Sequence, residues 1–383
     1  MHSDMVLESV LSATIAILVY TWVVYPVLLW LGASLRSSEE KNSRETATPM
    51  VSIIIAVHNE ERTIAAKLRD CTKLQYPADK LEILIASDGS NDSTESIVRS
   101  AARQDPRIRL IASDGRLGKS GVQNLAVVHA QGDLLLFTDA EASFAPKALR
   151  SMVDKLGDPK VGLVTATVLW GHPEDAIEKG QGFYWRYELF LRNAESRLGI
   201  LATGSGQALL VRRELFRPVP SRYGDDCVMP IAVRLQGYRV VQDGDAIVFD
   251  TMPHSIEGEL RTRVRMTARN WTGTLARPAI FNLFRFPLTA AGLISHKLLR
   301  WLTPVFLALL LLLTIPLAVQ GKWMSFLVLQ LVFYFSALLG WRLSARQRSV
   351  GILGYAFSFC LANVGFALGI IKAFRQQAII TYR

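Results

Sequence analysis

Long stretches without charge at both ends of the chain constrain the fold more than any other feature of the sequence. A helix needs about 20 consecutive apolar residues to cross a bilayer. Four uncharged stretches are of about this length or longer, at residues 10–35, 301–319, 323–341 and 351–371. The sequence therefore predicts one transmembrane helix within residues 1–35 and about three more within residues 301–383.

The basic residues predict how the chain is oriented. No Lys or Arg precedes the first uncharged stretch, whereas Arg36, Lys41 and Arg44 follow it. Because cytoplasmic flanks of membrane helices are rich in Lys and Arg, we expect a multi-pass protein of the plasma or inner membrane with residues 36–300 in the cytoplasm. The basic residues near the carboxyl terminus do not fit this bias. The net charge of +10 lies mostly beside the apolar stretches and in the middle segment, so we expect contact with a lipid bilayer and not with nucleic acid.

The middle of the chain alternates between two patterns. Residues 36–49 are polar and rich in turn-forming residues, which predicts a linker. Short apolar, β-branched runs predict strands at 51–57, 81–87, 107–113 and 133–138. Helical spacing predicts helices at 61–73, 93–104 and 120–130. This alternation is typical of an α/β fold with a doubly wound parallel sheet.

Polar side chains gather where the predicted strands end. Asn59 and Glu60 follow the first strand, Asp88 follows the second, and Asp139 and Glu141 follow the fourth. In doubly wound sheets, ligands bind beyond the carboxyl ends of the strands. Three acidic groups at one edge indicate a positively charged ligand. The pair Asp139 and Glu141 could hold a divalent cation, since carboxylates are hard oxygen ligands, or it could cap the turn that follows.

Four segments occur in a recognisable order: VSIIIAVHNEERTI, LIASDGSNDST, GKSGVQNLA and FTDAEASF. Together they resemble the inverting family 2 glycosyltransferases with a GT-A (Rossmann-like) nucleotide-sugar fold. The resemblance covers roughly residues 50–275. With the apolar flanks, it is closest to the membrane-bound group that includes the hyaluronan, chitin, cellulose and poly-N-acetylglucosamine synthases. The resemblance implies a cytoplasmic catalytic domain over residues 50–255, followed by interfacial helices over 256–300.

The resemblance also implies a function. It predicts a hexosyltransferase that uses a UDP-sugar and Mg²⁺ or Mn²⁺ to extend a polysaccharide, with inversion at the sugar. Transfer of a single sugar to a lipid carrier or lipid acceptor is the alternative, and a membrane sensor that binds nucleotide without catalysis is a third possibility. The sequence alone leaves the sugar and the acceptor open.

The residues that match the family's motifs have implied roles. Asp139 and Glu141 would hold the metal. Residues implied in donor binding are Asn59, Glu60, Asp88, Lys119, Asp139 and Arg269. Asp226 would be the general base, and residues implied in acceptor binding are Gly204, Ser205, Asp225 and Trp271. Simpler interpretations stay open: Lys119 as a solvated lysine, and Asp226 as an exposed helix cap.

One segment departs from the family pattern. Processive relatives carry a Gln or Arg, two variable residues and then Arg-Trp, but here Asn270 separates Arg269 from Trp271. The basic segment RTRVRMTARNW could hold a diphosphate through its arginines, or it could lie on anionic lipid as an amphipathic helix. The departure leaves repeated addition of sugars open.

Overall fold

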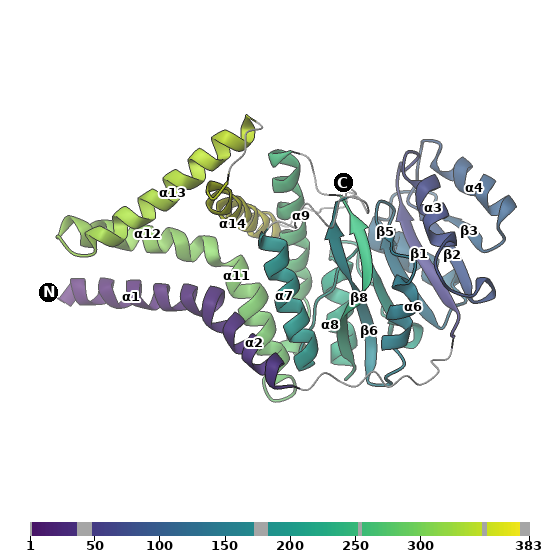
Figure 1. The fold of residues 1–383 in the computed structure, drawn as a ribbon, viewed down its shortest axis with the longest axis horizontal. Coiled ribbons are helices and arrows are strands. Elements are labelled where there is room, and N and C mark those ends of the chain that lie inside the picture. Colours follow the sequence, from purple (N-terminus) through teal and green to yellow (C-terminus); the bar gives the residue numbers. More distant parts are fainter. Residues whose placement is uncertain (1, 37–47, 172–182, 252–254, 347–350, 376–383) are drawn as a thin grey trace.

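The computed structural model describes residues 2–36, 48–171, 183–251, 255–346 and 351–375. Most of the predicted linker over 36–49 lies outside the described residues, as does the end of the predicted segment 301–383. Figure 1 shows an α/β domain at one end of the molecule and a group of long helices at the other, with helices α7 (Phe183–Leu198) and α9 (Ile256–Leu275) between them.

An eight-stranded mixed sheet forms the centre of the α/β domain. Its strands are β1 (Val51–Val57), β2 (Leu81–Ser87), β3 (Ile108–Ala112), β4 (Leu134–Asp139), β5 (Ser143–Phe144), β6 (Val161–Trp170), β7 (Leu209–Arg212) and β8 (Arg239–Asp250). Their order across the sheet is β3-β2-β1-β4-β7-β6-β8-β5. The first two strands have the predicted bounds, and the next two lie within one residue of them at either end.

The prediction of a wholly parallel sheet is wrong beyond β4. Strands β1 to β4 are parallel, but β7 runs antiparallel to both of its neighbours, β4 and β6, and β5 runs antiparallel to β8. A strand that is buried on both faces has the same apolar composition whichever way it runs. The sequence pattern therefore predicted strands without their direction.

Both faces of the sheet are covered, which explains the uninterrupted apolar run of β1. Ile53 and Ile55 belong to the core on one face, and Ile54 and Ala56 belong to the core on the other. The covering helices are α3 (Ile64–Thr72), α4 (Thr94–Gln104), α5 (Lys119–His129), α6 (Ala148–Lys155) and α8 (Asp225–Leu235). Short 3₁₀ turns are η2 (Ala78–Lys80), η3 (Arg213–Leu215) and η4 (Pro278–Phe281).

The remaining helices form the other end of the molecule. They are α1 (His2–Val19), η1 (Tyr20–Val24), α2 (Tyr25–Leu35), α10 (Pro287–Gly292), η5 (Leu293–Leu298), α11 (Leu299–Trp301), α12 (Thr303–Val319), α13 (Met324–Ala345) and α14 (Leu353–Phe374). The segments η1 and η5 are π-helical, and they meet through a 2.8 Å hydrogen bond between the hydroxyls of Tyr20 and Ser295. Turns of this kind occur often at functional sites.

Three helical segments are long and apolar enough to span a membrane: Asp4–Leu35, Met324–Ala345 and Leu353–Phe374. A fourth candidate is the pair Pro287–Trp301 and Thr303–Val319, which is bent by 57°. The predicted span at 301–319 therefore corresponds to the second half of a bent pair. The described residues support three spans, or four if the bent pair crosses as one.

A seam of glycines joins α9 to the apolar helix α14. A Cβ atom added to Gly365 would lie 2.8 Å from the Cβ of Arg263, and one added to Gly369 would lie 2.6 Å from the Cβ of Thr267. Only glycine permits this approach of the two helices, as in the small-residue contacts between membrane helices.

Candidate active site

A cavity of about 290 Å³ lies between the sheet and the helices. Its walls come from the ends of β4 and β6 and from helices α5, α7, α8 and α9, and it reaches Trp301 of α11 and Phe366 of α14. We call one part of it the strand end, defined by Lys119, Asp139 and Asp225. Parallel α/β sheets bind ligands at this edge, so the position agrees with the sequence prediction.

Lys119 joins two carboxylates at the strand end. Its Nζ lies 2.7 Å from Oδ1 of Asp139 and 3.0 Å from Oδ2 of Asp225. Burial alone would lower the pKa of Lys119, but these two carboxylates outweigh burial and raise it above its ordinary value. The ammonium group is therefore fully charged. Lys119 is not the solvated lysine of the simpler interpretation.

The backbone before α5 places Lys119 at the helix start. Gly118 has a φ of +77°, which favours glycine. The carboxylate of Asp88 accepts hydrogen bonds from the backbone N–H groups of Leu117 at 2.5 Å and Gly118 at 3.1 Å, and from Arg116 at 3.2 Å. Asp88 thus fixes the loop that carries Lys119. A lysine at a helix amino terminus is well placed to bind an anionic phosphate.

Two adjacent aspartates at the start of α8 have opposite properties. Burial would raise the pKa of Asp225, but Lys119 and Arg269 lower it. Burial and the charge of Asp225 raise the pKa of Asp226. Two carboxylates in one site with pKa values pushed apart are a common sign of separate roles in acid–base chemistry. Asp226 is the one suited to accept a proton, and it is half-buried, not an exposed cap.

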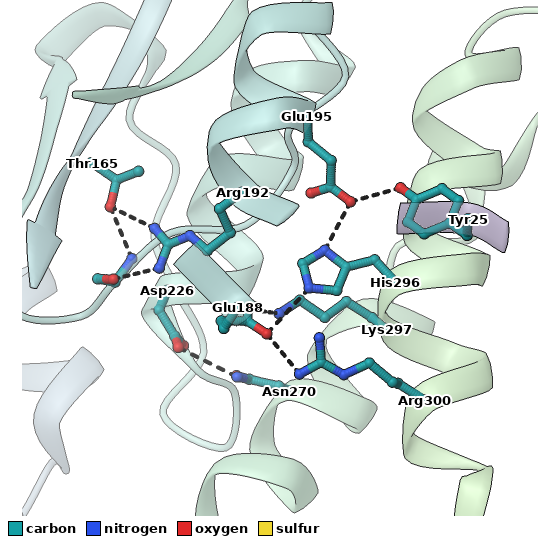
Figure 2. Close-up of polar contacts among 11 residues, drawn as sticks. Tyr25, Thr165, Glu188, Arg192, Glu195, Asp226, Asn270, His296, Lys297 and Arg300 are labelled. Atoms are coloured by element: carbon teal, nitrogen blue, oxygen red, sulfur yellow. Dashed lines mark hydrogen bonds and ion pairs between the residues drawn. The ribbon is translucent and has the colours of Figure 1, made fainter. Parts of the chain in front are cut away.

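Asn270 orients Asp226. Its Nδ2 donates to Oδ2 of Asp226 at 3.3 Å (Figure 2), and the backbone N–H of Gly204 donates to the carbonyl of Asp226 at 2.7 Å. Gly224 makes room for this contact, because a Cβ there would lie 2.3 Å from Oδ1 of Asn270 and 2.6 Å from Oδ1 of Asp226. The residue that breaks the Arg-Trp motif therefore contacts the candidate base.

Oxygen ligands for a divalent cation are present at the strand end. Asp139 and Glu141 both line the cavity, and Asp250 lies near Asp139. Burial raises the pKa of Asp250 to about 6; a hydrogen bond from Gln207 opposes this rise and the charge of Asp139 adds to it. No group of three or more His, Cys, Asp or Glu side chains among the described residues has the spacing to hold a metal alone. The donor set fits an ion that completes its coordination with phosphate oxygens and water.

The structure separates the other predicted residues into two groups. Glu60, Gly204, Ser205 and Arg269 line the cavity, while Asn59, Asp88 and Trp271 do not. The side chain of Asn59 accepts a hydrogen bond from the backbone of Asn91 at 2.9 Å, which ties the ends of β1 and β2 together. For the residues of both groups, the predicted contacts with the donor or the acceptor stay predictions.

Trp271 packs away from the cavity. Its ring lies edge-on to Trp301 with centroids 6.1 Å apart, and 6.3 Å from the ring of Phe374. The tryptophans that line the cavity are Trp170, Trp185 and Trp301.

Sequence reasoning missed the opposite part of the cavity. We call it the helix end, defined by Glu188, Arg192, Lys297 and Arg300 (Figure 2). Glu188 and Arg192 are four residues apart on α7, so they lie on one face of that helix. That spacing is the sequence signal that could have indicated the helix end.

The mixed sheet and its charged strand end agree with the GT-A fold that the sequence resembles. Residues 52–219, less than half of the chain, match the family model described as Glycosyl transferase family 2.

Curated relatives point in two directions. An N-acetylglucosaminyltransferase of Rhizobium meliloti (strain 1021) is 29% identical over 62% of this chain and 60% of its own length. A beta-monoglucosyldiacylglycerol synthase of Trichormus variabilis is 28% identical over 47% of this chain and 39% of its own length. The chain thus spans no more than about three fifths of these relatives.

One solved structure shares the fold over nearly the whole chain. It is the mannosyltransferase PcManGT from Pyrobaculum calidifontis, in complex with GDP-Man and Mn²⁺. Its TM-score is 0.74 at 23% identity, and the match covers 96% of this chain and 99% of that one. The likeness confirms the GT-A fold and extends it to the flanking helices.

Proposed function

We propose that the chain is a membrane-bound, inverting glycosyltransferase that moves a sugar from a UDP-sugar to a growing polysaccharide. The observation that supports it most is the presence, in one cavity, of a lysine between two carboxylates and a half-buried aspartate of raised pKa beside them. The first group suits a nucleotide diphosphate, and Asp226 suits the acceptor hydroxyl.

The donor diphosphate would lie at the strand end. Lys119 and Arg269 face it with positive charge, and both line the cavity. Asp139 and Glu141, with Asp250 beside them, would hold Mg²⁺ or Mn²⁺, which when bound supplies Lewis-acid neutralisation of the leaving diphosphate. Lys119 would turn from Asp139 towards the phosphates once the donor enters.

Asp226 would act on the acceptor. Its carboxylate takes the proton of the acceptor hydroxyl while the oxygen attacks the anomeric carbon from the side opposite the diphosphate. The bond between that carbon and the diphosphate oxygen breaks, and its electron pair leaves with UDP. The new glycosidic bond has inverted configuration. Asn270 holds the receiving oxygen in place, so it is a positioning residue.

We place the enzyme in the plasma or inner membrane with the cavity on the cytoplasmic side. The apolar helices at both ends of the chain and the basic residues after the first of them support this placement. Arg36 donates to the carbonyl of Leu198 at 2.7 Å, so the end of the first apolar helix is anchored to α7 of the cavity wall. A nucleotide sugar made in the cytoplasm would reach the cavity directly.

Transfer of one sugar to a lipid is the second candidate. It is favoured by the cavity wall at Trp301 and Phe366, which places the acceptor side next to the apolar helix α14. A relative named for a glucosyldiacylglycerol product supports the same candidate. Product size separates the two: a ladder of polymers supports the first, and a single glycolipid supports the second.

The full chain in lipid nanodiscs, supplied with membrane lipid extract, tests the proposal. Nucleotide release would be measured for a panel of UDP-sugars and for GDP-mannose, with Mg²⁺, Mn²⁺ or EDTA, and products would be sized. We expect release with one UDP-sugar only when metal is present. No release with any donor, or equal release in EDTA, would contradict the proposal.

A further inference from the structure

The helix end of the cavity holds more positive charge than negative charge. Glu188 accepts from Lys297 at 2.6 Å, from Arg300 at 2.7 Å and from His296 at 3.2 Å (Figure 2). Burial would raise the pKa of Glu188, but Lys297, Arg300 and His296 hold it well below its ordinary value. Glu188 is therefore a carboxylate, and it is shared by more cations than it can neutralise.

Arg192 adds a further charge without a carboxylate of its own. Its side chain is more than nine-tenths buried and lines the cavity. Its Nη1 donates to Ser205 at 2.6 Å and its Nη2 donates to Thr165 at 3.2 Å, both of them neutral. Its Nε has no hydrogen-bond partner among the described residues. Arg192 forms no ion pair among the described residues, although the charges of Glu188, Asp226 and Glu195 act on it.

The neighbouring carboxylate Glu195 attracts Arg192 but forms no hydrogen bond with it. Glu195 accepts from Nδ1 of His296 at 2.8 Å and from the hydroxyl of Tyr25 at 2.8 Å (Figure 2). Leaving a buried cation without a paired carboxylate is costly. A buried guanidinium that lines a cavity in this state is suited to bind an anion.

The cations of the helix end share the cavity with the candidate base. Arg192 and Asp226 line the same cavity and interact electrostatically. A molecule that presents a hydroxyl to Asp226 could therefore place a second group against Arg192, Lys297 and Arg300. That group must be anionic. This anionic group is not the nucleophile. A hydroxyl needs a base such as Asp226 in order to attack, whereas an ionised phosphate does not.

The far wall of the helix end is apolar. Trp301 and Phe366 line the cavity there, and both belong to a buried cluster on α11 and α14. The cavity is thus lined by the base, by the cations and by the side of an apolar helix. These three surfaces suit the sugar, the phosphate and the hydrocarbon chain of one acceptor.

Building on the proposed function, we propose that the helix end binds the phosphate of the acceptor, which is a sugar carried on a membrane lipid through a phosphate or diphosphate group. The sugar hydroxyl reaches Asp226 while Arg192, Lys297 and Arg300 hold the phosphate. The polysaccharide would then grow on, or start from, a phosphate-linked lipid.

Three acceptors with the same sugar test this on the full chain in nanodiscs. They are N-acetylglucosamine on farnesyl diphosphate, N-acetylglucosamine on a neutral farnesyl ether, and N-acetylglucosamine 1-phosphate. We expect the KM of the diphosphate lipid to be at least tenfold below that of the neutral ether. Equal KM values for these two would overturn the anion site. A soluble sugar phosphate that works as well as the lipid would overturn the lipid part.

Variants separate a binding role from a structural one. Lys297→Gln should raise the KM for the diphosphate acceptor about tenfold, abolish its preference over the ether and leave the KM for the donor unchanged. Lys297→Arg should restore the preference for the diphosphate acceptor. Glu188→Gln should have the opposite effect and lower the KM for the diphosphate acceptor. Lower thermal stability with an unchanged preference in both variants would overturn the proposal.

The control is Arg261→Gln, an exposed arginine of α9 that pairs with Glu257 and does not line the cavity. It should change none of these values. The comparison of acceptors with the unmodified chain needs no variant, so it decides even if Lys297→Gln does not fold. If nucleotide is released but the diphosphate acceptor is not preferred over the neutral ether, this inference fails and the proposed function stands. If no donor gives nucleotide release, both fail.

Discussion

The two ends of the cavity are built in different ways. The strand end takes Asp139 from the last residue of β4 and Lys119 from the first residue of α5, so the edge of one sheet and a helix that covers it bring them together. The helix end takes Glu188 from α7 and Lys297 from η5, which are 109 residues apart. A sheet edge positions its polar residues through local rules, whereas the helix end exists only after distant helices have packed.

The two ends also differ in how their charges are arranged. At the strand end one lysine lies between two carboxylates, an arrangement ready to exchange partners when a cation and a diphosphate enter. At the helix end one carboxylate is shared by several cations. The first arrangement suits a ligand that brings its own metal, and the second suits a bare anion.

The largest effect should come from the strand end. Asp139→Asn removes the carboxylate that would hold the divalent cation, and we expect nucleotide release to fall by about four orders of magnitude, because lost charge neutralisation of a leaving group is worth several kcal/mol. Steady-state release at saturating Mn²⁺ measures this. Asp79→Asn, on an exposed turn, is the matched control. Activity within tenfold of the unmodified chain would show that Asp139 does not hold a catalytic cation, and the contrast between the two ends would fail.

Replacing the base should have the next largest effect. Asp226→Asn removes the proton acceptor but keeps the contact with Asn270, so we expect kcat to fall about a hundred- to a thousandfold while donor affinity, measured by calorimetry, stays unchanged. A loss of donor affinity as large as the loss of kcat would instead show that Asp226 binds the donor at the strand end.

The pH profile checks the same assignment. A base works only when it is deprotonated, so the raised pKa of Asp226 places the acid limb of kcat/KM above the range of an ordinary carboxylate, and activity is lost as the pH falls through it. Asp225→Asn removes the neighbouring negative charge and should move this limb to lower pH. A limb that stays in place would show that another group, such as Asp250, controls it.

Gly224→Ala should have a smaller effect. The new Cβ would press on both Asn270 and Asp226, and a displaced base costs roughly tenfold in kcat or more. Gly244→Ala is the control, because nothing lies within 4 Å of a Cβ at that position and its φ is not in the left-handed region. Equal kcat values for the two variants would show that the base tolerates displacement.

The smallest effect distinguishes two tryptophans. Trp301→Leu should raise the KM of the acceptor a few fold, since an aromatic contact is worth about 1 kcal/mol. Trp271→Leu should lower the melting temperature and leave that KM unchanged, because Trp271 packs outside the cavity. The reverse pattern would restore Trp271 as the acceptor platform that its sequence position suggested.

Much of the α/β half could be predicted because its signals are local. An apolar run followed by a polar turn predicted β1 and the end of β4, and the motif around Lys119 predicted a helix start. The direction of β7 could not be predicted, since a doubly buried strand looks the same in either orientation. Lys119 and Asp225 belong to different motifs, and no spacing rule predicts that they form an ion pair.

Asn270 illustrates the remaining gap. In the sequence it separates an expected pair of residues, Arg and Trp, and this left repeated addition of sugars open. In the structure it is the hydrogen-bond donor to Asp226, because α9 packs across the start of α8. The meaning of a departure from a motif depends on which helix face the changed residue occupies, and that face is set by tertiary packing.

If the proposed function holds, the glycine seam between α9 and α14 predicts that the surrounding lipid affects turnover. Since Gly365 and Gly369 allow direct contact, any tilt of α14 that matches it to a thicker or thinner bilayer is passed mechanically to the helix that carries Asn270. We infer that acyl-chain length alters kcat, and that Gly365→Leu, which separates the helices, weakens this response. Turnover in nanodiscs of short and long phosphatidylcholines measures it, and a kcat independent of chain length would show that the two helices are mechanically uncoupled.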